Sequence, residues 1–258
     1  MDLTGKVALV TGAAQKRSIG WGIASALALA GADVAVNDAY HLDELEARAA
    51  DLKAMGRRSL AVQADVTDDA QVVRMLETLV ESLGRIDIVV SNAGIARWET
   101  FSDITLKNTR DLLRINMLGN ANVCRAAAKQ MVKQGEGGRI IIVSSVQSDV
   151  QFPITPVYGA TKHAMHSFVG SVALELAPHN ITVNHIGPGW VRSPLNDVAP
   201  DQKTEADIDA QKAGVPLGRD GKIEEMGAAI RYLASDEAAY TTGAFIRVDG
   251  GLGIGKYL

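Results

Sequence analysis

The chain has 258 residues, a length that suits one large α/β domain or two small ones, and its 47% hydrophobic content is enough to build a sizeable core. Its 26 Lys and Arg against 30 Asp and Glu give a net charge of −4, which argues against a general nucleic-acid or anionic-membrane surface. The single cysteine excludes an internal disulfide, and without a signal-like start or an apolar run of spanning length the sequence predicts a cytoplasmic protein that binds neither nucleic acid nor membrane.

Short apolar runs of strand length recur along the chain. They cover 7–10, 34–36, 60–62, 86–90, 139–143, 181–186 and 244–248. Because these runs lack polar alternation, they are typical of strands covered on both faces, as in a parallel sheet.

Helical patterns fill the intervals between the strands, at 20–31, 42–55, 68–83, 105–134, 156–178 and 223–235. The run Thr67-Asp68-Asp69 begins and Gly84 ends the third of these helices, and Gly31 ends the first. Strands that alternate with helices over the whole length predict an α/β fold, a single-domain Rossmann-like doubly wound parallel sheet of about seven strands flanked by helices. We therefore expect one dinucleotide-binding and catalytic domain over 1–258.

The least regular stretch is 188–220. It has Pro188, Pro194 and Pro200 in its first part and many charges after them. A long irregular segment in a compact fold is usually functional or mobile, so we expect a substrate loop at about 190–217.

A glycine-rich turn, 11–22, follows the first predicted strand and leads into an Ala-rich helix. Gly12 and Gly20 allow a sharp turn and close approach to a pyrophosphate, which the helix N-terminus would hold, although an ordinary strand-to-helix turn reads the same way. Asp38, 18 residues after Gly20, ends the second strand, near the spacing expected for an acid that binds an adenosine ribose. Its charge would repel a 2′-phosphate and favours NAD; Lys16 and Arg17 pull toward NADP, which is not excluded.

From here the residues resemble the short-chain dehydrogenase/reductase family over essentially the whole chain. The motifs occur in order: the Thr-Gly turn at 11–22, Asp65-Val66, Asn92-Ala93-Gly94, Asn116, Ser144-Ser145, Tyr158-x-x-x-Lys162 and Pro188-Gly189. Any one of these motifs occurs by chance, whereas the ordered set is specific. The resemblance implies a nicotinamide cofactor and a catalytic group of four residues.

The turn departs from the family pattern. Two residues are inserted, and Ser18 stands where the middle glycine is expected. The segment 16–24 looks more like the cofactor loop of enoyl-acyl-carrier-protein reductases, but that branch places six residues between its Tyr and Lys, whereas three intervene here. The catalytic half therefore resembles carbonyl reductases and alcohol dehydrogenases.

Tyr158 and Lys162 lie four apart in a predicted helix, so both side chains share one face. A phenol with a pKa near ~10 is a poor base at neutral pH, and we expect the neighbouring ammonium to lower that pKa. Tyr158 and Lys162 alone would indicate an ordinary pair on a helix surface. Ser145 lies 13 residues before Tyr158 and just after a predicted strand, and this position favours a catalytic role for the three residues.

The resemblance implies the remaining roles. Ser145 would orient the substrate oxygen, Tyr158 would be the general acid/base, Lys162 would hold the nicotinamide ribose, and Asn116 would hold a water chain for the proton. The implied cofactor-binding residues are Gly12, Ser18, Ile19, Gly20, Asp38, Asp65, Val66, Asn92, Ala93, Gly94, Tyr158, Lys162, Pro188, Gly189, Val191 and Ser193. No metal site is expected, since His163 and His166 lack a third ligand nearby.

The sequence thus predicts a hydride-transferring oxidoreductase that prefers NAD and acts on a secondary alcohol, sugar or carbonyl substrate. A 3-oxoacyl thioester reductase, an enoyl reductase and a non-catalytic dinucleotide sensor remain alternatives. The segments 97–99, 147–157 and 190–217 would shape the substrate site. By family resemblance the last strand and the helices at 105–134 and 156–178 would assemble a homotetramer.

Overall fold

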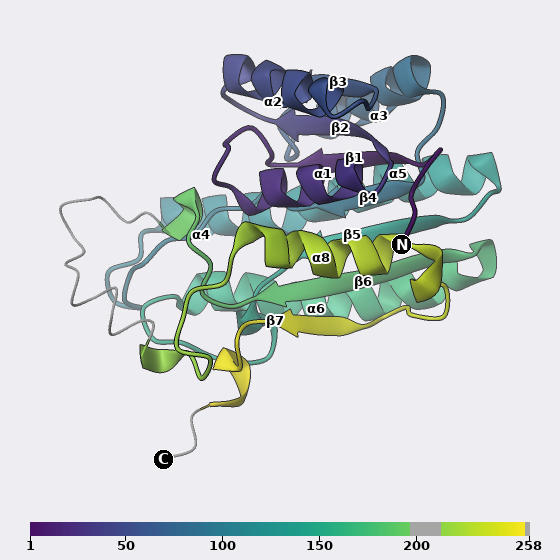
Figure 1. The fold of residues 1–258 in the computed structure, drawn as a ribbon. Coiled ribbons are helices and arrows are strands. Elements are labelled where there is room, and N and C mark those ends of the chain that lie inside the picture. The colour runs from purple at the N-terminus through teal and green to yellow at the C-terminus, as the bar shows by residue number, and fades with distance from the viewer. Residues whose placement is uncertain (197–212, 256–258) are drawn as a thin grey trace.

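The computed structural model describes residues 1–196 and 213–255 and contains one seven-stranded parallel sheet (Figure 1). Its strands are β1 (Val7–Thr11), β2 (Asp33–Asp38), β3 (Ser59–Gln63), β4 (Ile88–Ser91), β5 (Gly138–Val143), β6 (Ile181–Pro188) and β7 (Phe245–Val248). They lie in the order β3-β2-β1-β4-β5-β6-β7, and each neighbouring pair is parallel. The seven predicted strands and the doubly wound Rossmann-like fold are confirmed. The chain changes direction across the sheet between β1 and β4, where such folds form a ligand crevice.

Helices cover both faces of the sheet. The described α-helices are α1 (Ile19–Leu29), α2 (Leu42–Ala54), α3 (Asp69–Leu83), α4 (Leu106–Leu113), α5 (Asn120–Gln134), α6 (Pro156–Leu176) and α8 (Ile223–Ala234). In Figure 1, α1 and α8 lie in front of the sheet, and α5 and α6 lie behind it. Short 3-10 turns occur at Val146–Ser148, Ala177–His179, Pro194–Asn196, Asp236–Ala238 and Leu252–Ile254.

Two hydrophobic cores sandwich the sheet. Val10 of β1 belongs to the core that holds Ile23 of α1 and Ile230 of α8. Leu9, the next residue back, belongs to the opposite core with Leu79 of α3 and Val123 of α5. Successive strand side chains point to opposite faces. Both faces are apolar, which explains why the strand sequences show no polar alternation.

The predicted ends of two helices are confirmed. The Asp68 side chain accepts a hydrogen bond from the backbone of Gln71 (3.1 Å) at the start of α3, and Gly84 ends that helix in the left-handed conformation (φ 95°). Gly31, with φ 105°, follows the end of α1. These capping signals depend on residues within one helical turn, so they can be recognised in the sequence without knowledge of the fold.

The single helix predicted over 105–134 is wrong in one respect, because a π-helical turn, Arg114–Gly119, separates α4 from α5. The Asn120 side chain explains the wider turn: its Nδ2 donates to the main-chain carbonyl of Asn116 (2.7 Å), inside the backbone ladder.

Helices α1 and α8 are in close contact through glycines. A Cβ added at Gly22 would lie 2.7 Å from the Cβ of Ile223, and one at Gly227 would lie 2.7 Å from the Cβ of Ala26. Any larger side chain at either glycine would push the two helices apart.

The predicted substrate loop at about 190–217 is only partly described, since 197–212 lie outside the described residues. On its described flanks, Val191 forms a parallel bridge with Gly221, whose N–H donates to the Trp190 carbonyl (2.8 Å). Within the described ranges, no helix combines the length and apolarity needed to cross a membrane.

Candidate active site

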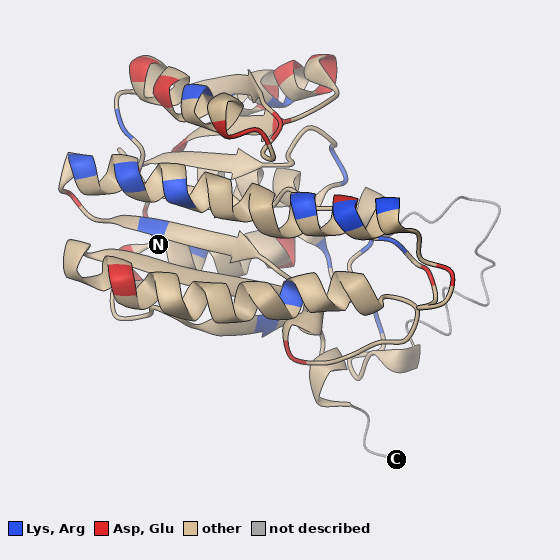
Figure 2. Ribbon diagram, turned by 180° about the vertical axis from the view of Figure 1, so that it is seen from behind, with Lys and Arg blue, Asp and Glu red and all other residues tan. Residues whose placement is uncertain are grey.

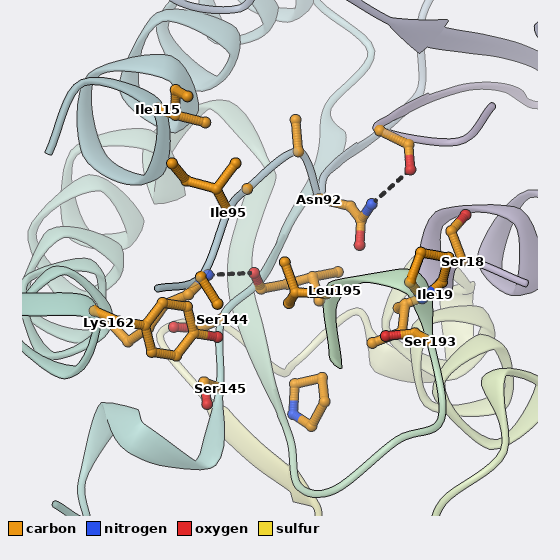
Figure 3. Close-up of a pocket in the computed structure, with 18 of the residues that line it drawn as sticks. Ser18, Ile19, Asn92, Ile95, Ile115, Ser144, Ser145, Lys162, Ser193 and Leu195 are labelled. Carbon is orange, nitrogen blue, oxygen red and sulfur yellow. Dashed lines mark hydrogen bonds between the residues drawn. The ribbon is translucent and has the colours of Figure 1, made fainter. Parts of the chain in front are cut away.

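A cavity of about 740 Å³ opens at the carboxyl ends of the central strands, where the strand order reverses. Its lining comes from the turns after β1, β2, β3, β4, β5 and β6. In Figure 3, Lys162, Ser144 and Ser145 lie on one side of this cleft, and Ser18, Ile19 and Asn92 lie on the other. All predicted site residues line the cleft except Gly20 and Asn116, which support it from behind.

The first turn is held tightly enough to form a cradle. Gly12 has a positive φ of 67°, and a Cβ added at Gly20 would lie only 2.3 Å from the Gly12 carbonyl oxygen. Ser18 is the N-cap of α1, and its Oγ accepts from the Trp21 N–H (3.0 Å). At the position where the family pattern has its middle glycine, this chain therefore has a serine that caps the helix. The start of α1, at Ser18 and Ile19, lines the cleft and suits a phosphate group.

Asn92 and Thr11 clamp the two central turns together. The Thr11 Oγ1 accepts from the backbone N–H groups of Asn92 and Ala93, each at 3.0 Å. The Asn92 Nδ2 donates to the carbonyls of Thr11 (2.8 Å) and Gly12 (3.1 Å). Thr11 was not assigned as a site residue from the sequence, although a hydroxyl at the end of the first strand was its visible signal.

The two acids predicted on the adenosine side line the cleft. Asp38 ends β2, and its carboxylate accepts from the backbone N–H groups of Tyr40 (3.3 Å) and Ala14 (3.4 Å). Lys16 and Arg17 are described and exposed, and neither is among the described lining residues.

The Asp65 carboxylate is anchored at the end of β3. It accepts from the Thr67 N–H and hydroxyl (2.8 Å each) and lies 3.9 Å from the Arg114 guanidinium. Arg114 also lines the cleft, and it was missed in the sequence because nothing local connects it to Asp65.

The opposite wall holds the predicted catalytic side chains. Tyr158 and Lys162 lie on the buried face of α6, with 8% and 5% of their surface exposed, and Ser145 follows β5 with 7% exposed. The Lys162 Nζ lies 5.4 Å from the centroid of the Tyr158 ring and donates to the Val143 carbonyl (3.4 Å). The Ser145 Oγ accepts from the Gln147 N–H (3.1 Å).

Burial dominates the acid–base properties of this wall. It raises the pKa of Tyr158 to about 12, although a side-chain hydrogen bond with Ser145 opposes the rise. Burial also lowers the pKa of Lys162 to about 8. The expected lowering of the tyrosine pKa is therefore wrong for the protein's own groups, because burial, which disfavours the charged phenolate, is the largest effect on that pKa.

Asn116 braces the turn after β4. Its Oδ1 accepts from the Ile95 N–H and its Nδ2 donates to the Ile95 carbonyl, both at 2.9 Å, and Nδ2 also reaches the Thr161 Oγ1 (3.3 Å). A Cβ added at Gly94 would lie 3.2 Å from the Asn116 Oδ1 and 3.9 Å from the Lys162 Nζ. The Asn116 Oδ1 and the Lys162 Nζ thus both lie beside Gly94.

The segment after β6 completes the floor of the cleft. Gly189 is needed there because an added Cβ would lie 2.6 Å from the Cα of Asp249. The Ser193 Oγ is buried and has no hydrogen-bond partner among the described residues, although the residue lines the cleft. An orphaned hydroxyl, a glycine cradle and a helix N-terminus together fit a dinucleotide with a polar amide at one end.

No cluster of three or more His, Cys, Asp or Glu suited to a metal ion occurs in the parts of the chain that the structure describes.

Known proteins match the chain over nearly its full length. Residues 12–253 match a family model described as enoyl-(acyl carrier protein) reductase. The chain is 39% identical to L-rhamnose 1-dehydrogenase (NAD(P)(+)) of Sphingomonas sp. strain SKA58, over 97% of both chains. It is 38% identical to the 3-oxoacyl-[acyl-carrier-protein] reductase FabG of Staphylococcus aureus strain Mu50, over 96% of this chain and 98% of that one.

Solved structures agree with these relatives. A short-chain type dehydrogenase/reductase from Mycobacterium marinum superimposes with a TM-score of 0.90 at 38% identity, over 97% of this chain and 96% of that one. The chain therefore belongs to the short-chain dehydrogenase/reductase family and is an oxidoreductase that transfers a hydride between a nicotinamide cofactor, NAD(P), and an alcohol, sugar or carbonyl substrate.

Proposed function

We propose that this chain is an NAD-preferring dehydrogenase that oxidises a secondary alcohol or a sugar hydroxyl, or reduces the corresponding carbonyl, with Tyr158 as the general acid/base. One observation carries the proposal: Ser145 and Lys162 lie on one side of a cleft that Tyr158 also lines, and Ser18 and Ile19 of the first turn lie on the other side. Such a cleft can hold a dinucleotide against a proton donor.

The bound cofactor would supply or accept the hydride at its nicotinamide ring. The Ser145 hydroxyl would donate a hydrogen bond to the substrate oxygen. With its pKa raised to about 12, Tyr158 carries its proton at neutral pH, so it would protonate that oxygen during reduction.

In oxidation Tyr158 must take the proton. Lys162 supports this step because, with a pKa of about 8, it remains largely charged at pH 7, and its Nζ lies 5.4 Å from the centroid of the Tyr158 ring, where it can stabilise a phenolate. The proton would then leave past Lys162 toward Asn116, since the side chains of both residues lie beside Gly94. Asn116 is a positioning residue in this proposal.

Asp38 supports the preference for NAD. Its carboxylate lines the cleft at the end of β2, where it would accept ribose hydroxyls and repel a 2′-phosphate. Asp38→Ser should shift the ratio of kcat/KM for NAD over NADP toward NADP by at least tenfold, about 1.4 kcal/mol. An unchanged ratio would contradict the assignment.

Tyr158→Phe tests the catalytic assignment, because only the hydroxyl is removed. We expect kcat to fall by about 10³-fold or more while the dissociation constant for NADH changes less than twofold. The substrate screen would include polyols, aldoses, hydroxysteroids and 3-oxoacyl thioesters, with nicotinamide absorbance as the readout. A folded wild-type protein that binds NADH but turns over none of these would indicate a dinucleotide sensor instead.

We also propose that 1–258 act as one cytoplasmic domain that assembles as a homotetramer, with the substrate loop at about 190–217. Figure 2 shows few charges on α6 and none midway along the α4–α5 stretch. Exposed apolar side chains lie on these helices, among them Leu106 (73%), Leu118 (60%) and Leu174 (81%). Light scattering should give four times the 27.3 kDa chain mass; a monomer would refute the assembly.

A further inference from the structure

The substrate end of the cleft has an aromatic wall made by two separate loops. Trp98 follows β4 and Trp190 follows β6, and both line the cleft. Their ring centroids are 5.6 Å apart with an interplanar angle of 71°, an edge-to-face contact that holds both indoles in place. Leu195 and Leu252 add aliphatic surface to the same cleft.

One amide stands out against this apolar lining. Gln147 is two residues beyond Ser145 and is buried, and its Oε1 accepts from the Thr155 Oγ1 (2.9 Å). Gly159 leaves room for that oxygen, because an added Cβ would lie 3.0 Å from it. With the oxygen held, Nε2 is the amide atom left to donate a hydrogen bond. A purely apolar substrate would leave this donor unpaired.

Charged side chains in the described lining lie elsewhere. The basic side chains among them are His41, Arg114 and Lys162. His41 lies beyond Asp38 at the end of β2, and Arg114 forms an ion pair with Asp65. The Lys162 ammonium donates a hydrogen bond to the Val143 carbonyl, beside Tyr158. A carboxylate or phosphate group of a substrate bound beside Trp98 and Trp190 would thus lose its hydration, and no cationic side chain among the described lining residues would lie next to it in compensation.

We infer that the substrate is an uncharged cyclic polyol, a neutral sugar, and that Gln147 with the Trp98–Trp190 wall selects it over acidic analogues. This inference rests on the proposed function and specifies its substrate class. A sugar ring has a face of C–H groups, which packs against indoles, and a rim of oxygens that need hydrogen-bond partners. Gln147 Nε2 would donate to one rim oxygen while the reacting C–O group faces Ser145 and Tyr158.

Matched pairs of sugars and uronic acids test the inference. D-galactose and D-galacturonate, and D-glucose and D-glucuronate, differ only in a carboxylate at C6; L-rhamnose adds a neutral deoxy sugar. We expect kcat/KM with NAD to be at least 100-fold higher for neutral sugars than for the matched acids. Equal or higher values for the acids would overturn the inference.

The same panel separates this inference from the proposed function. Turnover of an acyclic alcohol, a hydroxysteroid or a 3-oxoacyl thioester without turnover of any sugar would overturn the substrate class and leave the dehydrogenase standing. No turnover of any compound by protein that binds NADH would overturn both.

Gln147→Lys tests the residue itself, because it places a cation where the amide donor lies. We expect the ratio of kcat/KM for uronate over neutral sugar to rise at least tenfold, and Gln147→Leu to raise KM for the neutral sugar with a smaller change in kcat. Gln151→Lys, on an exposed residue outside the main cleft, is the matched control. An unchanged ratio in Gln147→Lys, with NADH binding intact, would overturn the role of Gln147.

Discussion

Removing the buried charge of Lys162 should stabilise the protein while abolishing its activity. Burial lowers the lysine pKa from 10.5 to about 8, and each pKa unit corresponds to about 1.36 kcal/mol. At pH 7 the charged lysine therefore costs the folded state about 3 kcal/mol. Lys162→Met keeps an unbranched side chain without the ammonium, and it gives up one long hydrogen bond to the Val143 carbonyl, worth about 1 kcal/mol. We expect the variant to be about 2 kcal/mol more stable than wild type at pH 7.

The pH dependence of this effect has a defined sign. Between pH 8 and 10.5 the unfolded chain holds a proton on Lys162 that the folded protein has released, so wild-type stability rises with pH in that window. From pH 7 to pH 9.5 the wild type should gain about 2 kcal/mol relative to Lys162→Met.

Urea unfolding followed by circular dichroism, at fixed protein concentration and at both pH values, measures the difference. Lys53→Met, on an exposed lysine of α2, is the control and should follow wild type. The reasoning is refuted if wild type and Lys162→Met change equally with pH, or if the variant is the less stable of the two at pH 7.

Three further predictions concern other parts of the fold. Gly20→Ala should weaken NADH binding at least tenfold in a fluorescence titration, because the new Cβ meets the Gly12 carbonyl oxygen at 2.3 Å; Gly170→Ala, with open space around it, should not. Thr11→Val should also weaken NADH binding, since it removes the acceptor for two backbone N–H groups; wild-type affinity would contradict this. Burial lowers the pKa of His185 from 6.5 to about 4, so the unfolded chain binds a proton there first as the pH falls, and the wild type should lose about 2 kcal/mol of unfolding free energy between pH 7.5 and 5. The His185→Asn variant should lose about 2 kcal/mol less than wild type over the same range in urea unfolding. Equal losses in the two proteins would count against this reasoning.

Features that depend on neighbouring residues could be predicted from the sequence. Asp68 and Gly84 mark helix ends through bonds within one turn, and Tyr158 and Lys162 share a helix face because of their spacing. The strands could be found because both faces of a doubly wound sheet are apolar.

Features that depend on distant residues could not be predicted. The Thr11–Asn92 clamp joins groups 81 residues apart, and no local pattern announces it. The tyrosine pKa depends on how much water the whole wall excludes, so spacing to Lys162 alone gave the wrong direction. The π-helical turn at Arg114–Gly119 depends on one side-chain bond from Asn120, which a helical periodicity cannot reveal.

The glycine contact between α1 and α8 ties together the two functional ends of the cleft. Helix α1 begins at the cofactor turn, and α8 begins two residues after Gly221, which is bridged to Val191 beside the Trp190 wall. Gly22, packed on Ile223, therefore acts as a spacer between them. Substitutions at this spacer, remote from the chemistry, would change KM for cofactor and substrate together, so an engineer who wishes to retune one alone should leave it untouched.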